Sequence, residues 1–298
     1  MNKEIICINS HPTIESHVKA TVKTFKEAEK LDVDTMYVSH HHEIPEYINK
    51  NADHVYVDKR NEIIGFNTLK KYDYLCRPID EHSWFTGEKG DVIPTNSYAH
   101  YLNIKTSIQI ARVLGYEYVY ILVHDVDNFF YEKNFDKSFY PMQNNIKNHD
   151  MVFYPQVIDY INTSSKNKNS NILSTSLFAI NANCEAAKTF FNMNTIDEYS
   201  KIHEKWSPWL KNRFKTGYFG TNNSPTPLYY PCTYLEMVFA LEFHDKNIHI
   251  CKDYLPGGTC GFFHSLIGQE TPKHLKGKEV SEFQNVSKWR KKLDVVRT

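Results

Sequence analysis

Short apolar runs alternate with helical patterns along the first half of the chain. Residues 4–9, 35–40 and 54–59 are rich in β-branched and aromatic side chains, which predicts three buried strands. Apolar residues recur at helical spacing over residues 14–31, and residues 45–51 predict a second, shorter helix. A β-α-β-α-β order of this kind predicts an α/β fold with a mostly parallel sheet and right-handed crossovers.

A longer helix and the most hydrophobic strand follow a polar stretch over residues 80–96, which we expect to be a loop. Residues 99–114 have a helical apolar stripe, and Gly115 is a plausible stop for that helix. Residues 118–123, with the sequence YVYILV, predict a central buried strand. The three segments extend the alternation of strands and helices.

The second half of the chain is less regular. Residues 151–156 and 174–180 predict two more strands, and residues 248–251 a short one. Residues 228–244 contain an apolar helix. We expect one domain, because all these segments are short apolar elements that need a common core.

Composition excludes some functions and leaves others open. The chain has 35 Lys and Arg against 35 Asp and Glu, and this zero net charge argues against a general nucleic-acid binder. The N-terminus has no signal-peptide pattern, and the longest apolar run, residues 118–123, is far shorter than the roughly 20 residues of a membrane span. We therefore expect a cytoplasmic protein without a transmembrane segment.

The six cysteines contain no C-x-x-C pair, and several lie in apolar runs. This pattern indicates reduced core residues rather than a disulfide framework or a zinc site.

Two carboxylates follow the most hydrophobic strand. Asp125 and Asp127 come just after residues 118–123, and parallel sheets place their binding sites at the carboxyl ends of strands. Residues two apart in extended backbone point to the same side, and paired carboxylates are hard oxygen ligands for Mg²⁺ or Mn²⁺. The alternative is a capped turn, because Asp and Asn also favour turns.

The segment 118–128, YVYILVHDVDN, and the helix before it resemble the GT-A glycosyltransferase superfamily, and the opening strand with Asn9, His11 and Pro12 adds to the likeness. The likeness is to the fold pattern of residues 4–180. It implies a Rossmann-type, mostly parallel sheet flanked by helices.

The resemblance also implies how the chain is divided. A nucleotide-sugar-binding half would span residues 1–128, and an acceptor-binding half residues 129–298. The resemblance implies that Asp125 contacts the ribose or the metal. It implies that Asp127 coordinates the metal and the diphosphate, and thereby takes part in catalysis.

Further ligand contacts follow from the same resemblance. The nucleotide would lie across the ends of the first strands, which makes Asn9, His11 and Asp58 candidates for base or ribose contacts. Asp58 is equally interpretable as a solvated turn residue. His264, after a glycine-rich segment, is a candidate third ligand of the metal, since imidazole suits Mn²⁺; the alternative is an ordinary surface or core histidine.

Five other side chains are candidates with structural alternatives. Glu236 lies in an apolar helical run and is a candidate general base, with Glu242 as a competitor; either could instead be paired with a nearby Lys or Tyr. Lys105 could meet a phosphate or be a solvated helix-face lysine. The aromatic rings of Trp206 and Trp209, in a segment expected to be loop-like, could stack on an acceptor sugar or pack locally.

These features together predict a glycosyltransferase that uses Mn²⁺ or Mg²⁺ to move a sugar from a nucleotide-sugar donor to a glycan or lipid-linked acceptor, as in glycan or polysaccharide synthesis. A basic tail could touch an anionic membrane surface. Its cations are Lys288, Arg290, Lys291 and Lys292.

Three alternatives remain open. A nucleotidyltransferase would carry a Gly-rich loop after the first strand, where this chain reads NSHPTIES. A phosphatase of the haloacid-dehalogenase type would have Thr or Val two residues after the second Asp, where this chain has Phe129. A non-catalytic carbohydrate-binding protein would show no metal-dependent affinity for nucleotides.

Overall fold

The main sheet contains strands from both halves of the chain. The computed structural model describes residues 3–10, 15–40, 42–59, 76–78, 92–94, 97–124, 128–130, 135–156, 172–213, 235–243, 245–251 and 262–264. Within them, a seven-stranded sheet has the order β10-β8-β9-β6-β1-β2-β3. Its strands are β1 (Glu4–Ser10), β2 (Asp34–His40), β3 (His54–Asp58), β6 (Tyr118–His124), β8 (Met151–Gln156), β9 (Ile172–Asn181) and β10 (Ile248–Ile250).

Most neighbouring strands of this sheet are parallel. Strand β1 pairs in parallel with β2 and β6, β2 with β3, and β10 with β8. Strand β9 is antiparallel to both of its neighbours, β6 and β8. The prediction of a mostly parallel α/β sheet is therefore confirmed, with one reversed strand inserted in it.

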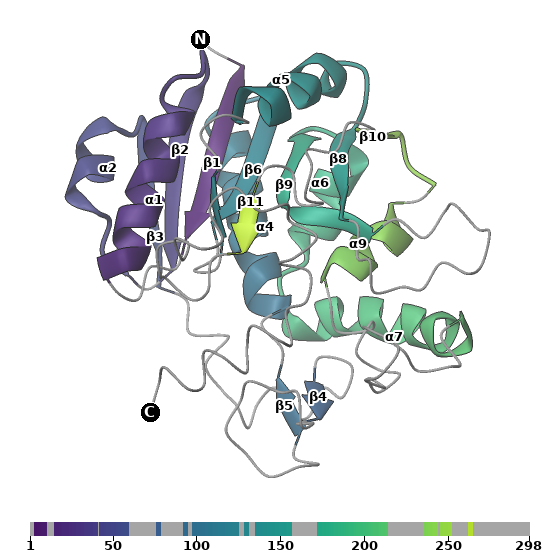
Figure 1. Ribbon diagram of the computed structural model, residues 1–298. Helices are drawn as coiled ribbons and strands as arrows, with labels where there is room; N and C mark the ends of the chain where they lie inside the picture. The colour runs from purple at the N-terminus through teal and green to yellow at the C-terminus, as the bar shows by residue number, and fades with distance from the viewer. Residues whose placement is uncertain are drawn as a thin grey trace.

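Helices cover both faces of the sheet (Figure 1). One face packs against α1 (Glu15–Ala28), α2 (Glu46–Asn51) and α5 (Phe135–Ile146). The other face packs against α4 (Ser97–Val113), α6 (Glu185–Lys188), the 3₁₀ turn η3 (Phe190–Asn192), α7 (Ile196–Arg213) and α9 (Leu235–Glu242). None of the described helices combines the length and the apolar character that are needed to cross a membrane.

Strand β1 shows why the sheet has two cores. Its residues are all buried, and alternate side chains point to opposite faces. Ile5 and Cys7 join the core under α4, whereas Ile6 and Ile8 join the core under α1. A strand covered on both faces buries side chains in both directions, which is why residues 5–8 in its middle form a continuous hydrophobic run.

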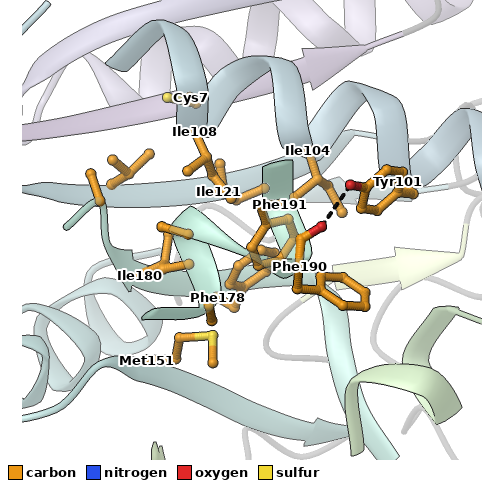
Figure 2. Close-up of a cluster of buried hydrophobic side chains, with 14 of the residues drawn as sticks. Cys7, Tyr101, Ile104, Ile108, Ile121, Met151, Phe178, Ile180, Phe190 and Phe191 are labelled. Atoms are coloured by element: carbon orange, nitrogen blue, oxygen red, sulfur yellow. Dashed lines mark hydrogen bonds between the residues drawn. The ribbon is translucent and has the colours of Figure 1, made fainter. Parts of the chain in front are cut away.

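The core under α4 is rich in aromatic rings (Figure 2). Phe178 on β9 and Phe191 in η3 stack with their centroids 6.3 Å apart. The Tyr101 hydroxyl on α4 donates a hydrogen bond of 2.6 Å to the carbonyl oxygen of Phe190. Burial raises the pKa of Tyr101, so the phenol stays protonated and remains a donor.

Helix α4 ends where the sequence predicts. The Gly115 N–H donates to the Arg112 carbonyl at 3.1 Å, and the Tyr116 N–H donates to the Ala111 carbonyl at 3.0 Å. Gly115 has a φ of 89°, so this is a Schellman motif with glycine in the left-handed conformation. The prediction that Gly115 stops the helix is confirmed.

Two pairs of short strands stand apart from the main sheet. Strands β4 (Cys76–Pro78) and β5 (Val92–Pro94) pair antiparallel, and so do β7 (Asn128–Phe130) and β11 (Phe262–His264). The prediction of a continuous loop over residues 80–96 is wrong at β5.

The second half of the chain holds more helix than the sequence pattern predicts. Helix α7 includes Trp206 and Trp209, so the loop-like interpretation of that segment is wrong. The helix begins with a capping box: the backbone N–H of Thr195 donates to the Glu198 carboxylate at 3.0 Å, and the Glu198 N–H donates to the Thr195 hydroxyl at 3.2 Å. These hydrogen bonds satisfy backbone groups that the first turn of the helix leaves without helical partners.

Candidate active site

Four parallel strands end at one edge of the sheet. Ser10 at the end of β1 is in register with Ser39 of β2 and with His124 of β6, and His40 is in register with Asp58 at the end of β3. This carboxyl edge therefore gathers chain segments that are far apart in the sequence. It is the edge at which parallel α/β sheets bind ligands.

The acidic pair adjoins this edge, although Asp125 and Asp127 lie outside the described residues. Asp125 directly follows His124, the last residue of β6, and Asp127 directly precedes Asn128, the first residue of β7. Metal binding by the two carboxylates stays a prediction.

Strand β11 brings a distant part of the chain to the same place. His264 is the antiparallel partner of Asn128. Directly opposed residues in such a pair have Cα atoms about 4.5–5.5 Å apart, and Asn128 is one residue from Asp127 in the chain. The pairing therefore places the backbone of His264 beside Asn128, the residue after Asp127 in the chain, and metal binding by His264 stays a prediction.

Asn9 lies at the carboxyl edge and is fully buried. The Ser107 hydroxyl on α4 donates a hydrogen bond of 2.5 Å to the Asn9 side-chain oxygen. The Asn9 side-chain nitrogen is enclosed and has no hydrogen-bond partner in the described structure. The amide is thus held in place with an unused donor. His11, the other candidate of this segment, lies outside the described residues.

Asp58 is buried at the end of β3, with 1% of its surface exposed, so the solvated-turn interpretation is wrong. The Thr106 hydroxyl on α4 donates to its carboxylate at 3.3 Å. Adjacent residues of α4 therefore contact the ends of β1 and β3, which fixes the helix against the carboxyl edge. Whether Asp58 contacts a base or ribose stays a prediction.

Lys105 is buried on α4, so the alternative of a solvated helix-face lysine is wrong. Its ammonium group donates to the carbonyl oxygen of Met193 and, at 2.9 Å, to the side-chain oxygen of Asn194. Lys105 and Ser107 are two positions apart on the helix, which corresponds to a rotation of about 200° around its axis. The ammonium group thus has protein partners on the side of α4 away from Asn9, and a phosphate contact stays a prediction.

The two glutamates of α9 differ. Glu242 forms an ion pair with Lys205 on α7 at 2.9 Å, which is the structural pairing that the sequence left open. Glu236 lies in the first turn of the same helix, and its side chain is outside the described part of the structure. The side chains of Trp206, Trp209 and His264 are outside it as well.

Sequence reasoning missed the polar face of α4. His100, Asn103 and Ser107 are spaced i, i+3 and i+7, so they share one face of the helix. The His100 Nε2 and the Asn103 Oδ1 are enclosed without hydrogen-bond partners in the described structure. The spacing of these polar residues is visible in the sequence. The apolar stripe on the same helix, however, predicts only a packing role for it.

No protein-family model matches the chain, and no curated protein does. Solved structures similar to it include nucleotide-sugar transferases, the class that the sequence resembles. A protein from Desulfovibrio desulfuricans, described as a nucleotide-diphospho-sugar transferase, is 11% identical over 84% of this chain and 80% of its own, with a TM-score of 0.38.

Two further structures are comparably similar. The galactosyltransferase LgtC, in complex with donor and acceptor sugar analogues, is 8% identical over 83% of this chain and 73% of its own, with a TM-score of 0.39. A mannose-1-phosphate geranyltransferase from Thermus thermophilus is 9% identical over the same shares, also with a TM-score of 0.39.

Proposed function

We propose that this chain is a metal-dependent glycosyltransferase that moves a sugar from a nucleotide-sugar donor to an acceptor hydroxyl. The pairing of Asn128 with His264 carries the proposal. It brings the backbone of a late histidine opposite Asn128, which directly follows Asp127 in the chain. The candidate metal site therefore draws three ligands from two distant segments of the chain, whereas an Asp-x-Asp that only forms a turn would supply two.

The proposed donor set suits Mn²⁺ or Mg²⁺. Asp125 and Asp127 would hold the ion through carboxylate oxygens, which are hard ligands, and His264 would add a nitrogen that Mn²⁺ accepts well. When bound, the ion neutralises the charge of a diphosphate leaving group.

The nucleotide would lie along the carboxyl edge. The buried Asn9 amide offers a donor and the Asp58 carboxylate an acceptor, and both are held by hydroxyl groups of α4. His11 is a further proposed contact to the base or ribose, and Lys105 is the proposed contact to a phosphate. Preformed polar groups of this kind orient a ligand at little entropic cost.

Glu236 is the proposed general base that deprotonates the acceptor hydroxyl. The ion pair of Glu242 with Lys205 supports this choice, because it gives the competing glutamate a structural partner on α7. The acceptor would be a glycan or a lipid-linked sugar in glycan or polysaccharide synthesis. The basic residues from Lys288 to Lys292 could then contact an anionic membrane from the cytoplasm.

Thermal stabilisation by nucleotides tests the metal site. We expect one of UDP, GDP or CMP, or its sugar conjugate, to raise the melting temperature with Mn²⁺ and not with EDTA, because a ligand that binds only the folded state stabilises it. In Asp125→Asn and Asp127→Asn this shift should disappear. Sugar transfer should fall about 100-fold or more, since the charge stabilisation by such a metal is worth several kcal/mol.

Asp32→Asn is the matched control, because Asp32 is exposed on the turn before β2 and far in sequence from the acidic pair. It should retain both the thermal shift and the transfer rate. Full transfer by either Asp125→Asn or Asp127→Asn would refute the proposed role of the pair.

A further inference from the structure

The polar face of α4 has unused hydrogen-bonding groups beside the carboxyl edge. We call His100, Asn103, Ser107 and Asn9 the α4 strip. Within it, the Asn9 Nδ2, the Asn103 Oδ1 and the His100 Nε2 are enclosed and lack partners in the described structure. Each unsatisfied buried polar group costs about 1–3 kcal/mol, so three together call for partners beyond the described structure.

The position of the strip points to a ligand. Ser107 is level with Asn9 at the end of β1. From Ser107 to His100 the helix rises about 10 Å toward its N-terminus, away from the Schellman motif at the start of β6. The strip therefore extends from the edge of the sheet along the side of the site where the nucleotide-sugar is proposed to bind.

Ser107 fixes the chemistry of the deepest group. Its hydroxyl oxygen lies 2.5 Å from the Asn9 Oδ1 and 3.2 Å from the Asn103 carbonyl oxygen. Because both are acceptors, the single hydroxyl proton is donated best over the shorter distance. The Asn9 oxygen is then occupied, and its NH₂ group is presented as a donor.

The hydrogen-bonding groups of the α4 strip favour a neutral ligand that carries hydroxyl groups. The strip offers a donor on Asn9, an acceptor on Asn103 and a ring nitrogen on His100 that can serve either way. It contains no Lys or Arg, and the Lys105 ammonium group lies on another side of α4, where it donates to Met193 and Asn194. A phosphate would want a cation here, whereas hydroxyl groups both donate and accept.

We infer that the α4 strip recognises the hydroxyl groups of a sugar ring, either the ribose or the transferred sugar of the donor. This inference rests on the proposed function. Asn9 and Asn103 are the recognising groups together with His100, and Ser107 is a positioning residue that sets the Asn9 amide.

Titration of variants tests the strip. Binding of UDP, UDP-glucose, UDP-galactose, GDP and GDP-mannose is measured with Mn²⁺ on the full chain, and unfolding of each variant is followed without ligand. For a ligand that the wild type binds, Asn103→Ala and His100→Ala should each raise the Kd about tenfold. Asn103→Asp keeps an acceptor oxygen and should recover part of the affinity.

Gln109→Ala is the control for packing. Gln109 lies about 200° around α4 from Ser107 and donates to the Phe191 carbonyl at 2.9 Å, so its loss weakens a bond on the other side of the same helix. It should leave the Kd within a factor of about two, as expected for a site that it does not touch.

The pattern of losses identifies the ring. Equal losses for UDP and UDP-glucose would support recognition of the ribose, and a loss for the sugar conjugate alone would support recognition of the transferred sugar. A wild type that binds, with Asn103→Ala and His100→Ala binding equally well, would refute the strip and leave the proposed function standing. A wild type that binds none of the five probes would overturn both.

Discussion

Lys105 shows how one buried cation can tie separate parts of the chain together. Its ammonium group reaches from α4 to Met193 and Asn194, just before α7 begins. Tyr101 and Gln109 donate to carbonyl oxygens of the same segment. Since these carbonyl groups have few other donors available in a turn, α4 supplies what the turn itself lacks.

Replacing Lys105 with methionine should lower the free energy of unfolding by about 1–3 kcal/mol, because buried acceptors lose a charged donor while the packing volume is kept. Lys50→Met is the control, since Lys50 is exposed and, within the described part of the chain, forms its ion pair with Glu46 on its own helix; its loss should cost about 0.5 kcal/mol or less. Urea denaturation measures both values. Equal losses would contradict the structural role, and a raised nucleotide Kd in Lys105→Met alone would support the phosphate contact.

Single residues of the candidate site differ in how well sequence predicts them. Asn9 and Asp58 could be selected because they end predicted strands, and strand ends meet at one edge of a parallel sheet. His100 and Asn103 could not, because their interest depends on whether a partner is present in three dimensions. The burial of Asp58 likewise depends on Thr106 of a distant helix.

At the scale of elements, the end of α4 isolates a backbone effect. Gly115 has a φ of 89°, and a Cβ atom added there would meet no atom within 4 Å. Gly115→Ala should therefore destabilise the protein by about 1 kcal/mol through the left-handed backbone alone.

Gly115→Asn is the informative comparison, because asparagine tolerates this conformation better than alanine does. Thermal and urea unfolding should rank the three proteins glycine, asparagine, alanine. An alanine variant as stable as the wild type would mean that the Schellman motif rearranges without cost.

Strongly patterned elements could be predicted, and locally polar ones could not. The strand over residues 151–156 matches β8 because a run of large apolar residues has few other uses. Helix α7 was missed because polar and charged residues make up most of its sequence, although Ile196, Tyr199 and Ile202 recur at helical spacing and pack in the core under α4. The Thr195 and Glu198 pair was a readable signal of its start.

For the whole molecule, the β-α-β-α-β order was enough to predict parallel strands and therefore the edge where a ligand is proposed to bind. The reversed direction of β9 was not predictable, because a buried strand has the same apolar pattern in either direction. The pairing of β7 with β11 was not predictable either, because it joins residues that are far apart in the sequence, and no local pattern encodes such a contact.

The sheet order predicts a gradient of stability. Strand β1 is paired on both sides and fully buried, whereas β3 pairs only with β2 in the described structure and exposes Val55 and Tyr56. Amides in the middle of β1 should therefore exchange with solvent roughly 100-fold more slowly than those of β3, because opening an edge needs less free energy.

Hydrogen exchange followed by mass spectrometry compares both strands in one sample, so each serves as the reference for the other. Equal protection of β1 and β3 would mean that the sheet opens as one unit or that another segment covers the β3 edge.

The C-terminal end of α4 is fixed by its Schellman motif, and this limits where the chain can tolerate insertions and deletions. The motif joins the helix directly to β6, so the C-terminal part of the helix cannot shift. An extra residue between Asn103 and Ser107 must therefore displace the part of α4 that precedes the insertion. Each added residue turns that part of the helix by about 100° and moves it about 1.5 Å. His100 and Asn103 would leave the face of Ser107, while the apolar core under the helix would also lose its register. Length variation among any descendants of this chain should therefore collect before Ser97, and substitutions alone should tune the strip.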